Sequence, residues 1–253
     1  MRHARSDPQT YFRVGATNYW TAMVLALTAV VFAGGLHVEW PVSLLAIYQG
    51  IQYQITYILL FTLIAIGGLA VTFTILRMSV IVPILGSIVL WGESPEILRI
   101  IGILMMLAAL PLIGADARHK AGLSGLRVTA LLMLVAIGIT GTGALAAKSF
   151  AEIRVQSNAL DYSVLTFVGA SVSTVVTWPL VQRLVRKHQI ADTPHLERTG
   201  RPWKSWLPIG IGLGVANIIQ NSALVEALSQ IPGTLVFPVI VSSYLLLILL
   251  ADY

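Results

Sequence analysis

Cysteine is absent from the 253 residues of this chain, and charged residues make up only 11% of them. The lack of cysteine excludes disulfides, thiolate zinc sites, iron–sulfur clusters and cysteine nucleophiles. The lack of charge is equally informative, because soluble domains carry about 25% charged residues and use them to face water. The composition therefore argues strongly against a soluble enzyme, and its apolar content argues against a disordered chain.

Apolar residues are abundant instead, at 57% of the chain, with a mean hydropathy of +0.83. They form continuous runs rather than alternating with polar residues, which is typical of membrane helices rather than of transmembrane strands. A helix needs about 20 mostly apolar residues to cross a bilayer. We therefore expect an all-α, polytopic membrane protein with eight transmembrane helices. The expected spans lie near residues 18–36, 50–73, 78–92, 97–115, 128–147, 163–182, 206–225 and 233–251.

Two of these spans need comment. The span at 78–92 is short, and Pro83 predicts a kinked or broken helix there. The first span follows several arginines and resembles a signal peptide, but the apolar run of residues 19–36 is longer than the usual 7–15 residues of such a peptide. We interpret it as the first transmembrane helix.

The positive charges are distributed unevenly between the two faces that the eight spans define. Sixteen Lys and Arg residues against eleven Asp and Glu give a net charge of +5. Thirteen of the sixteen fall on the face of the N-terminus, and only Arg99, Lys148 and Arg154 fall on the other. The positive-inside rule places the first face in the cytoplasm, so the charge indicates topology rather than nucleic-acid binding.

The stretch 182–206 is the one long hydrophilic segment, with Pro194, Gly200 and Pro202 as helix breakers. We expect a solvated loop that helps to set the topology. A site for lipid headgroups or for a protein partner is the alternative interpretation.

Two segments 155 residues apart are similar to one another: LRMSVIVPILGSIVLW, residues 76–91, and IPGTLVFPVIVSSYLL, residues 231–246. Their prolines, Pro83 and Pro238, align. The first segment continues through Gly92 and Glu93 to Gly102 in a helix that follows a short loop. Residues 76–114 resemble the end of an EamA repeat of the drug/metabolite transporter superfamily, and residues 207–253 resemble its second repeat more loosely.

The resemblance implies a specific architecture. Members have two inverted repeats of five helices, a common plan of secondary transporters. Residues 1–115 would supply helices two to five and residues 116–253 helices six to nine, so the chain is expected to lack the first and the last helix, as a truncated reading frame would. Sequencing the flanking DNA tests this. The resemblance also implies that both termini of the complete protein are cytoplasmic, which conflicts with the charge bias, so both orientations stay open.

Polar residues inside the expected spans are the candidate site. A polar side chain facing lipid is costly unless it is paired or lines a cavity. We predict a substrate site of neutral hydrogen-bonding groups, which the family comparison places on helices three and eight of the central cavity. Interhelical polar packing is the alternative for the seventh span, and an interfacial aromatic belt for the second. The six candidates are Gln49, Gln52, Tyr53, Asn217, Gln220 and Asn221.

The remaining chemical groups give weaker signals. Glu93 is interpreted as a carboxylate in a loop or at a helix start, stabilised by the helix dipole, with a structural role in the repeat as the alternative. Glu226 is interpreted as an interfacial residue, with proton coupling as the alternative. The five histidines have no ligand spacing, so we predict neither a metal nor a cofactor. Gly210 and Gly214 have the spacing of close helix packing.

Three functions compete at this point. An intramembrane enzyme needs paired carboxylates, a nucleophile with a base, or metal ligands within the spans, and the sequence offers none, so we predict a non-enzyme. The preferred function is a secondary transporter that exports a small uncharged or zwitterionic metabolite across the plasma membrane, here the inner membrane of a bacterium, by alternating access. The alternative is a membrane scaffold or assembly protein that acts through residues 182–206. The oligomeric state is left open.

Overall fold

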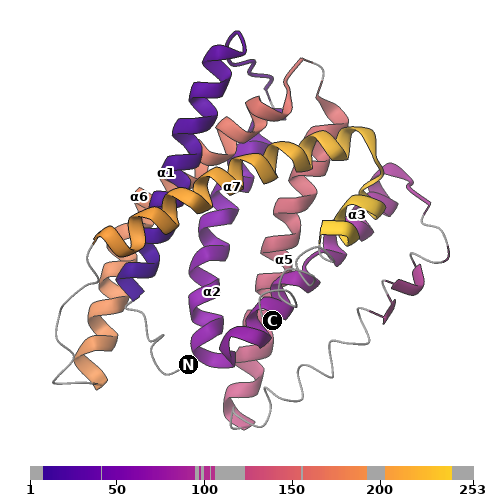
Figure 1. The fold of residues 1–253 in the computed structure, drawn as a ribbon. Helices are drawn as coiled ribbons and strands as arrows, with labels where there is room; N and C mark the ends of the chain where they lie inside the picture. Colours follow the sequence, from indigo (N-terminus) through magenta and orange to yellow (C-terminus); the bar gives the residue numbers. More distant parts are fainter. Residues whose placement is uncertain are drawn as a thin grey trace, which may run out of the picture. The chain divides into compact units, whose positions relative to one another are not determined.

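The computed structural model describes residues 8–40, 42–94, 97, 100–102, 104–105, 123–154, 156–192 and 203–240. Within these ranges the chain is helical with connecting turns and contains no strand, which confirms the all-α prediction. Residues 233–240 are helical as well. The longer helices are α1 (Pro8–Phe32), α2 (Val42–Met78), α3 (Ile81–Trp91), α5 (Leu123–Ile153), α6 (Ala159–Asp192) and α7 (Trp203–Gln230), as Figure 1 shows.

Among the described residues, five helices are long and apolar enough to cross a membrane, which confirms the membrane-protein prediction. Their apolar segments are Thr10–Phe32, Val42–Ile64, Leu131–Ile153, Ala159–Arg183 and Trp203–Gln230. Each corresponds to one expected span, because a long uncharged run forms a helix that satisfies its own backbone hydrogen bonds.

The other three expected spans are not established. Helix α3 has 11 residues and is too short to cross a bilayer as a single helix. It is short because α2 continues to Met78, the chain turns at Ser79 and Val80, and Gly92 ends α3 with a left-handed φ of 64°. The expected spans 97–115 and 233–251 lie mostly outside the described residues.

The hydrophilic stretch 182–206 is more helical than expected. Helix α6 continues to Asp192 and α7 begins at Trp203. The prediction of a loop beginning at residue 182 is therefore wrong. Charged residues do not end a helix by themselves, and residues 180–192 contain neither glycine nor proline. The expected breakers fall at 193–202, outside the described residues.

The chain divides into two compact units. Unit 1 comprises residues 1–54 and 155–223, and unit 2 comprises residues 55–154 and 224–253. The boundaries fall within α2 and α7, so each of these helices contributes to both units. Each unit also takes segments from both halves of the sequence, whereas the predicted repeats are the halves 1–115 and 116–253.

Unit 1 is built around the contact of α1 with α6, which run side by side in Figure 1. Its core joins Tyr19, Ala22 and Ala26 of α1 to Phe167 and Ala170 of α6. The α1 residues recur at three- and four-residue spacing and thus share one face of the helix. The small alanines allow the two helices to approach closely.

Close approach also depends on glycine in both α2 and α7. A Cβ on Gly50 would lie 2.0 Å from the Thr166 carbonyl oxygen, so a larger residue cannot be accommodated there without a backbone shift. In α7, a Cβ on Gly210 would lie 2.7 Å from the Thr17 Cβ, and one on Gly214 would lie 2.7 Å from the Asn18 carbonyl oxygen. The predicted packing role of Gly210 and Gly214 is confirmed.

Unit 2 packs α2 and α3 against α5. Leu63 of α2 and Ala136 of α5 are buried against one another. Helix α3 lies so close to α5 that a Cβ on Gly141 would approach the Val82 Cβ to 2.4 Å.

Candidate functional site: a buried polar network

A network of neutral polar side chains joins α2, α6 and α7 within unit 1. Gln49 donates through Nε2 to the Tyr53 hydroxyl (3.0 Å), and Tyr53 donates to the Asn221 Oδ1 (3.1 Å). Asn221 donates through Nδ2 to the Ser163 hydroxyl (3.1 Å). The Tyr162 hydroxyl closes the other end by donating to the Gln49 Oε1.

Burial makes this network strong. Gln49 and Asn221 are only 2% exposed, and Tyr162 and Ser163 are fully buried. A hydrogen bond between membrane helices contributes about 1–2 kcal/mol, and an unpaired polar atom at the same place would cost more. The network therefore stabilises one packing of α2, α6 and α7, and its members are neutral groups with both donors and acceptors.

Three of the six predicted site residues thus meet: Gln49, Tyr53 and Asn221. Gln52 is buried on the same helix. Asn217 donates instead to the Asn18 Oδ1 of α1 at 2.9 Å.

Gln220 is exposed, unlike the other two predicted amides of α7, Asn217 and Asn221. Successive helical residues are about 100° apart, so Asn217 and Asn221 differ by about 40° while Gln220 and Asn221 differ by about 100°. A face centred on the first pair leaves Gln220 at its edge.

The contributions of α6 and α1 were not predicted from the sequence. Tyr162 and Ser163 hold the network from α6, and Thr174 and Thr177 form a second connection from the same helix to Gln54, with bonds of 3.0 and 2.8 Å. A sequence signal exists, because hydroxyl residues recur on α6 at three- and four-residue spacing. However, hydroxyl side chains in a helix can equally donate to backbone carbonyls of the same helix, as Thr174 also does to Ala170.

A second polar group lies in unit 2 and is charged. Lys148 of α5 is 1% exposed and its Nζ lies 2.9 Å from the Glu93 Oε1. It also pairs with Glu152 one turn along the helix. The Glu93 carboxylate in addition accepts the backbone N–H groups of Gly233 and Thr234, both at 2.9 Å.

Glu93 therefore caps the first turn of the helical residues 233–240. Burial alone would raise the pKa of Glu93, but the hydrogen bonds from Thr234, Lys148 and Gly233 and the charge of Lys148 outweigh it, so that the pKa lies below its ordinary value. The predicted interaction with a helix dipole is present. It involves the first turn of residues 233–240.

The sequence analysis treated Lys148 as a loop cation, whereas it lies inside the apolar segment Leu131–Ile153. Its position next to Glu93 depends on the packing of α5 and has no sequence signal beyond the four-residue spacing to Glu152. Glu226 is 54% exposed and pairs with Arg154 at 3.4 Å, in keeping with an interfacial residue. In the described part of the chain, no three potential metal ligands lie together.

No family model, curated protein or solved structure matches the chain.

Proposed function

We propose that the chain is a secondary transporter of the EamA type that exports a small, uncharged or zwitterionic metabolite across the plasma membrane. The observation that carries this proposal is the buried network of Gln49, Tyr53, Asn221, Ser163 and Tyr162. All five residues belong to helices that are long and apolar enough to cross a membrane.

The chemistry of the network suits a neutral polar solute. Polar side chains within the bilayer are costly and commonly mark substrate pathways. Amide and hydroxyl groups offer donors and acceptors without net charge, so a metabolite with hydroxyl, amino or carbonyl groups can exchange its own hydrogen bonds for theirs. An anion or a cation would find no opposite charge within the network.

The two compact units support alternating access as the mechanism. Transporters of this kind move one bundle against another around the substrate site. Each unit here combines segments from both halves of the sequence, and α2 and α7 carry network residues in unit 1 before they continue into unit 2. The eight-span arrangement, with inverted repeats at 1–115 and 116–253, belongs to the same proposal.

The test uses Tyr53→Phe, which removes one hydroxyl and keeps the ring. The variant breaks the bonds to Gln49 and Asn221 with little change in volume. Loss of one such bond in the transport step corresponds to about a tenfold fall in flux. The substrate is first found by a metabolite screen of a deletion strain, and flux is then measured in proteoliposomes.

Thr28→Ala is the control, because Thr28 is exposed and its hydroxyl donates to the carbonyl of Val24 in its own helix. Its flux should equal that of the wild type. Unchanged flux in both Tyr53→Phe and Asn221→Ala would remove the network from the transport pathway. Replacing residues 193–202 by a Gly-Ser linker tests the scaffold alternative, since a transporter should retain its flux.

A further inference from the structure

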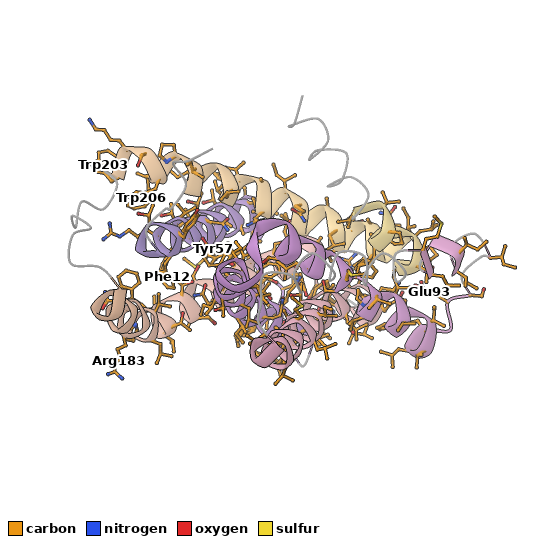
Figure 2. All side chains as sticks on the ribbon, turned by 90° about the horizontal axis from the view of Figure 1, so that it is seen from below. Phe12, Tyr57, Glu93, Arg183, Trp203 and Trp206 are labelled. Atoms are coloured by element: carbon orange, nitrogen blue, oxygen red, sulfur yellow. The ribbon has the colours of Figure 1, made fainter. Side chains whose placement is uncertain are left out.

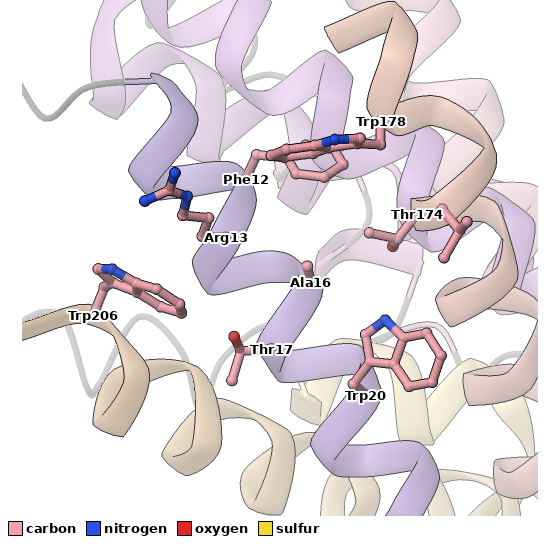
Figure 3. Close-up of a pocket in the computed structure, with 9 residues that line it drawn as sticks. Phe12, Arg13, Ala16, Thr17, Trp20, Thr174, Trp178 and Trp206 are labelled. Atoms are coloured by element: carbon pink, nitrogen blue, oxygen red, sulfur yellow. The ribbon is translucent and has the colours of Figure 1, made fainter. Parts of the chain in front are cut away.

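A cavity of about 340 Å³ lies between α1, α6 and α7 in unit 1, apart from the polar network. Figure 3 shows α1 running between α6 on one side and α7 on the other. The walls are largely aromatic: Phe12 and Trp20 from α1, Trp178 from α6 and Trp206 from α7. The Phe12 and Trp178 rings pack with centroids 5.0 Å apart.

Two features give this aromatic cavity a polar character. Arg13 is its single charged lining residue, and no acidic side chain of the described residues lines it. The Trp206 Nε1 is buried and has no hydrogen-bond partner among the described residues. A buried N–H without a partner costs free energy. A lining cation and an unpaired indole N–H on one of the lining residues fit an anionic group that accepts hydrogen bonds.

The position of the cavity indicates where such an anion comes from. The apolar segments of α1 and α7 begin at Thr10 and Trp203, and that of α6 ends at Arg183, so the cavity lies towards the same end of the three apolar segments. Phe12, Trp203, Trp206 and Arg183 gather at this end of unit 1 (Figure 2). Tryptophan is enriched at membrane interfaces, and basic residues there attract anionic lipids.

We propose that this cavity binds the headgroup of an anionic phospholipid. The phosphate pairs with Arg13, whose planar guanidinium matches phosphate oxygens. It also accepts the Trp206 Nε1–H, while the glycerol and the first acyl carbons lie against Trp20, Trp178 and Phe12. The volume is in the range of small-molecule sites. The site is distinct from the polar network and does not depend on the proposed transport.

The test measures quenching of tryptophan fluorescence by brominated lipid. The full chain is placed in phosphatidylcholine nanodiscs that contain brominated phosphatidylglycerol or brominated phosphatidylcholine at equal mole fraction. Three of the six tryptophans line the cavity, so a bound lipid quenches them. One arginine near an anionic lipid surface contributes about a fivefold preference for anionic over zwitterionic lipid. We therefore expect half-maximal quenching at about a fivefold lower mole fraction of brominated phosphatidylglycerol than of brominated phosphatidylcholine.

Arg13→Gln should abolish this preference, whereas Arg183→Gln should retain it, because Arg183 is exposed at the same end and does not line the cavity. Equal quenching of the wild-type chain by the two lipids would overturn the proposal even if the variant did not fold. A preference that survives in Arg13→Gln would also overturn it. If dilute glycerol phosphate in water reversed the specific quenching, the cavity would bind a soluble anion and the proposal would also be overturned.

Discussion

Replacing Lys148 by methionine is expected to lower the free energy of unfolding by about 3–5 kcal/mol, the usual cost of removing one partner from a buried ion pair. Lys148 is 1% exposed, lies 2.9 Å from the Glu93 Oε1 and also pairs with Glu152. Methionine replaces the apolar stem but not the charge. Glu93, 12% exposed, then keeps only the backbone N–H groups of Gly233 and Thr234.

The measurement is unfolding of the purified chain in mixed micelles, with rising dodecyl sulfate and circular dichroism as the signal. A double-mutant cycle with Glu93→Gln isolates the pair. Because each single change leaves a buried group without its partner, the two changes together should cost less than their sum. We expect a coupling of about 1–3 kcal/mol, within the range of contacting residues.

The pair of Arg154 and Glu226 is the control within the same unit. Its atoms lie 3.4 Å apart and Glu226 is 54% exposed, so solvent screens the interaction. Arg154→Gln should therefore cost less than about 1 kcal/mol. Equal small effects of Lys148→Met and Arg154→Gln, or strictly additive effects in the cycle, would refute the view that Lys148 and Glu93 form a buried pair.

Three further outcomes follow from single contacts. The pKa of Glu93 is lower in the folded chain than in the unfolded chain. The ionised carboxylate therefore stabilises the fold above the unfolded glutamate pKa of about 4.3, and this stabilisation is lost as the pH falls through the folded pKa. Measured unfolding free energies should show this loss on acidification in the wild type and not in Glu93→Gln. Gly50→Ala should lower the free energy of unfolding by about 1–3 kcal/mol or more in the same assay, because the added Cβ would lie 2.0 Å from the Thr166 carbonyl oxygen. Gly212→Ala is the control: its added Cβ would have no atom within 4 Å, so the change should be neutral or stabilising. Asn158→Ala should lower the free energy of unfolding by about 1 kcal/mol, because the Asn158 Oδ1 caps α6 by accepting the backbone N–H groups of residues 160 and 161. The loss should appear as a lower unfolding midpoint.

The long helices were predictable because their signal is local. An uncharged run of about 20 residues identifies a spanning helix whatever it packs against. Helices α2, α5, α6 and α7 cover their expected spans, and α1 covers the first one up to Phe32. Helix ends were less accurate, as α6 shows, because a polar sequence remains helical until a breaker interrupts it. The short length of α3 results from the turn at Ser79 and Val80. Pro83 predicted a kinked or broken helix in this region but did not locate the turn.

The candidate site was predictable in part for the same reason. Gln49, Tyr53 and Asn221 stood out because polar residues in apolar helices are costly. Their partners Tyr162 and Ser163 did not stand out. Tyrosine and serine are common in spanning helices, and only the rotation of α6 against α2 and α7 brings their hydroxyl groups to the amides.

The sequence by itself determined that this is a helical membrane protein, because the low charge and the apolar run lengths act residue by residue. It also located Gly210 and Gly214, two of the glycines that permit close packing. Only the tertiary structure decided which polar groups meet: it buried Lys148 against Glu93, left Gln220 exposed and formed the aromatic cavity that Arg13 lines. Hydrogen bonds and ion pairs depend on distances of a few ångströms, and the relative rotation of helices far apart in the sequence sets those distances.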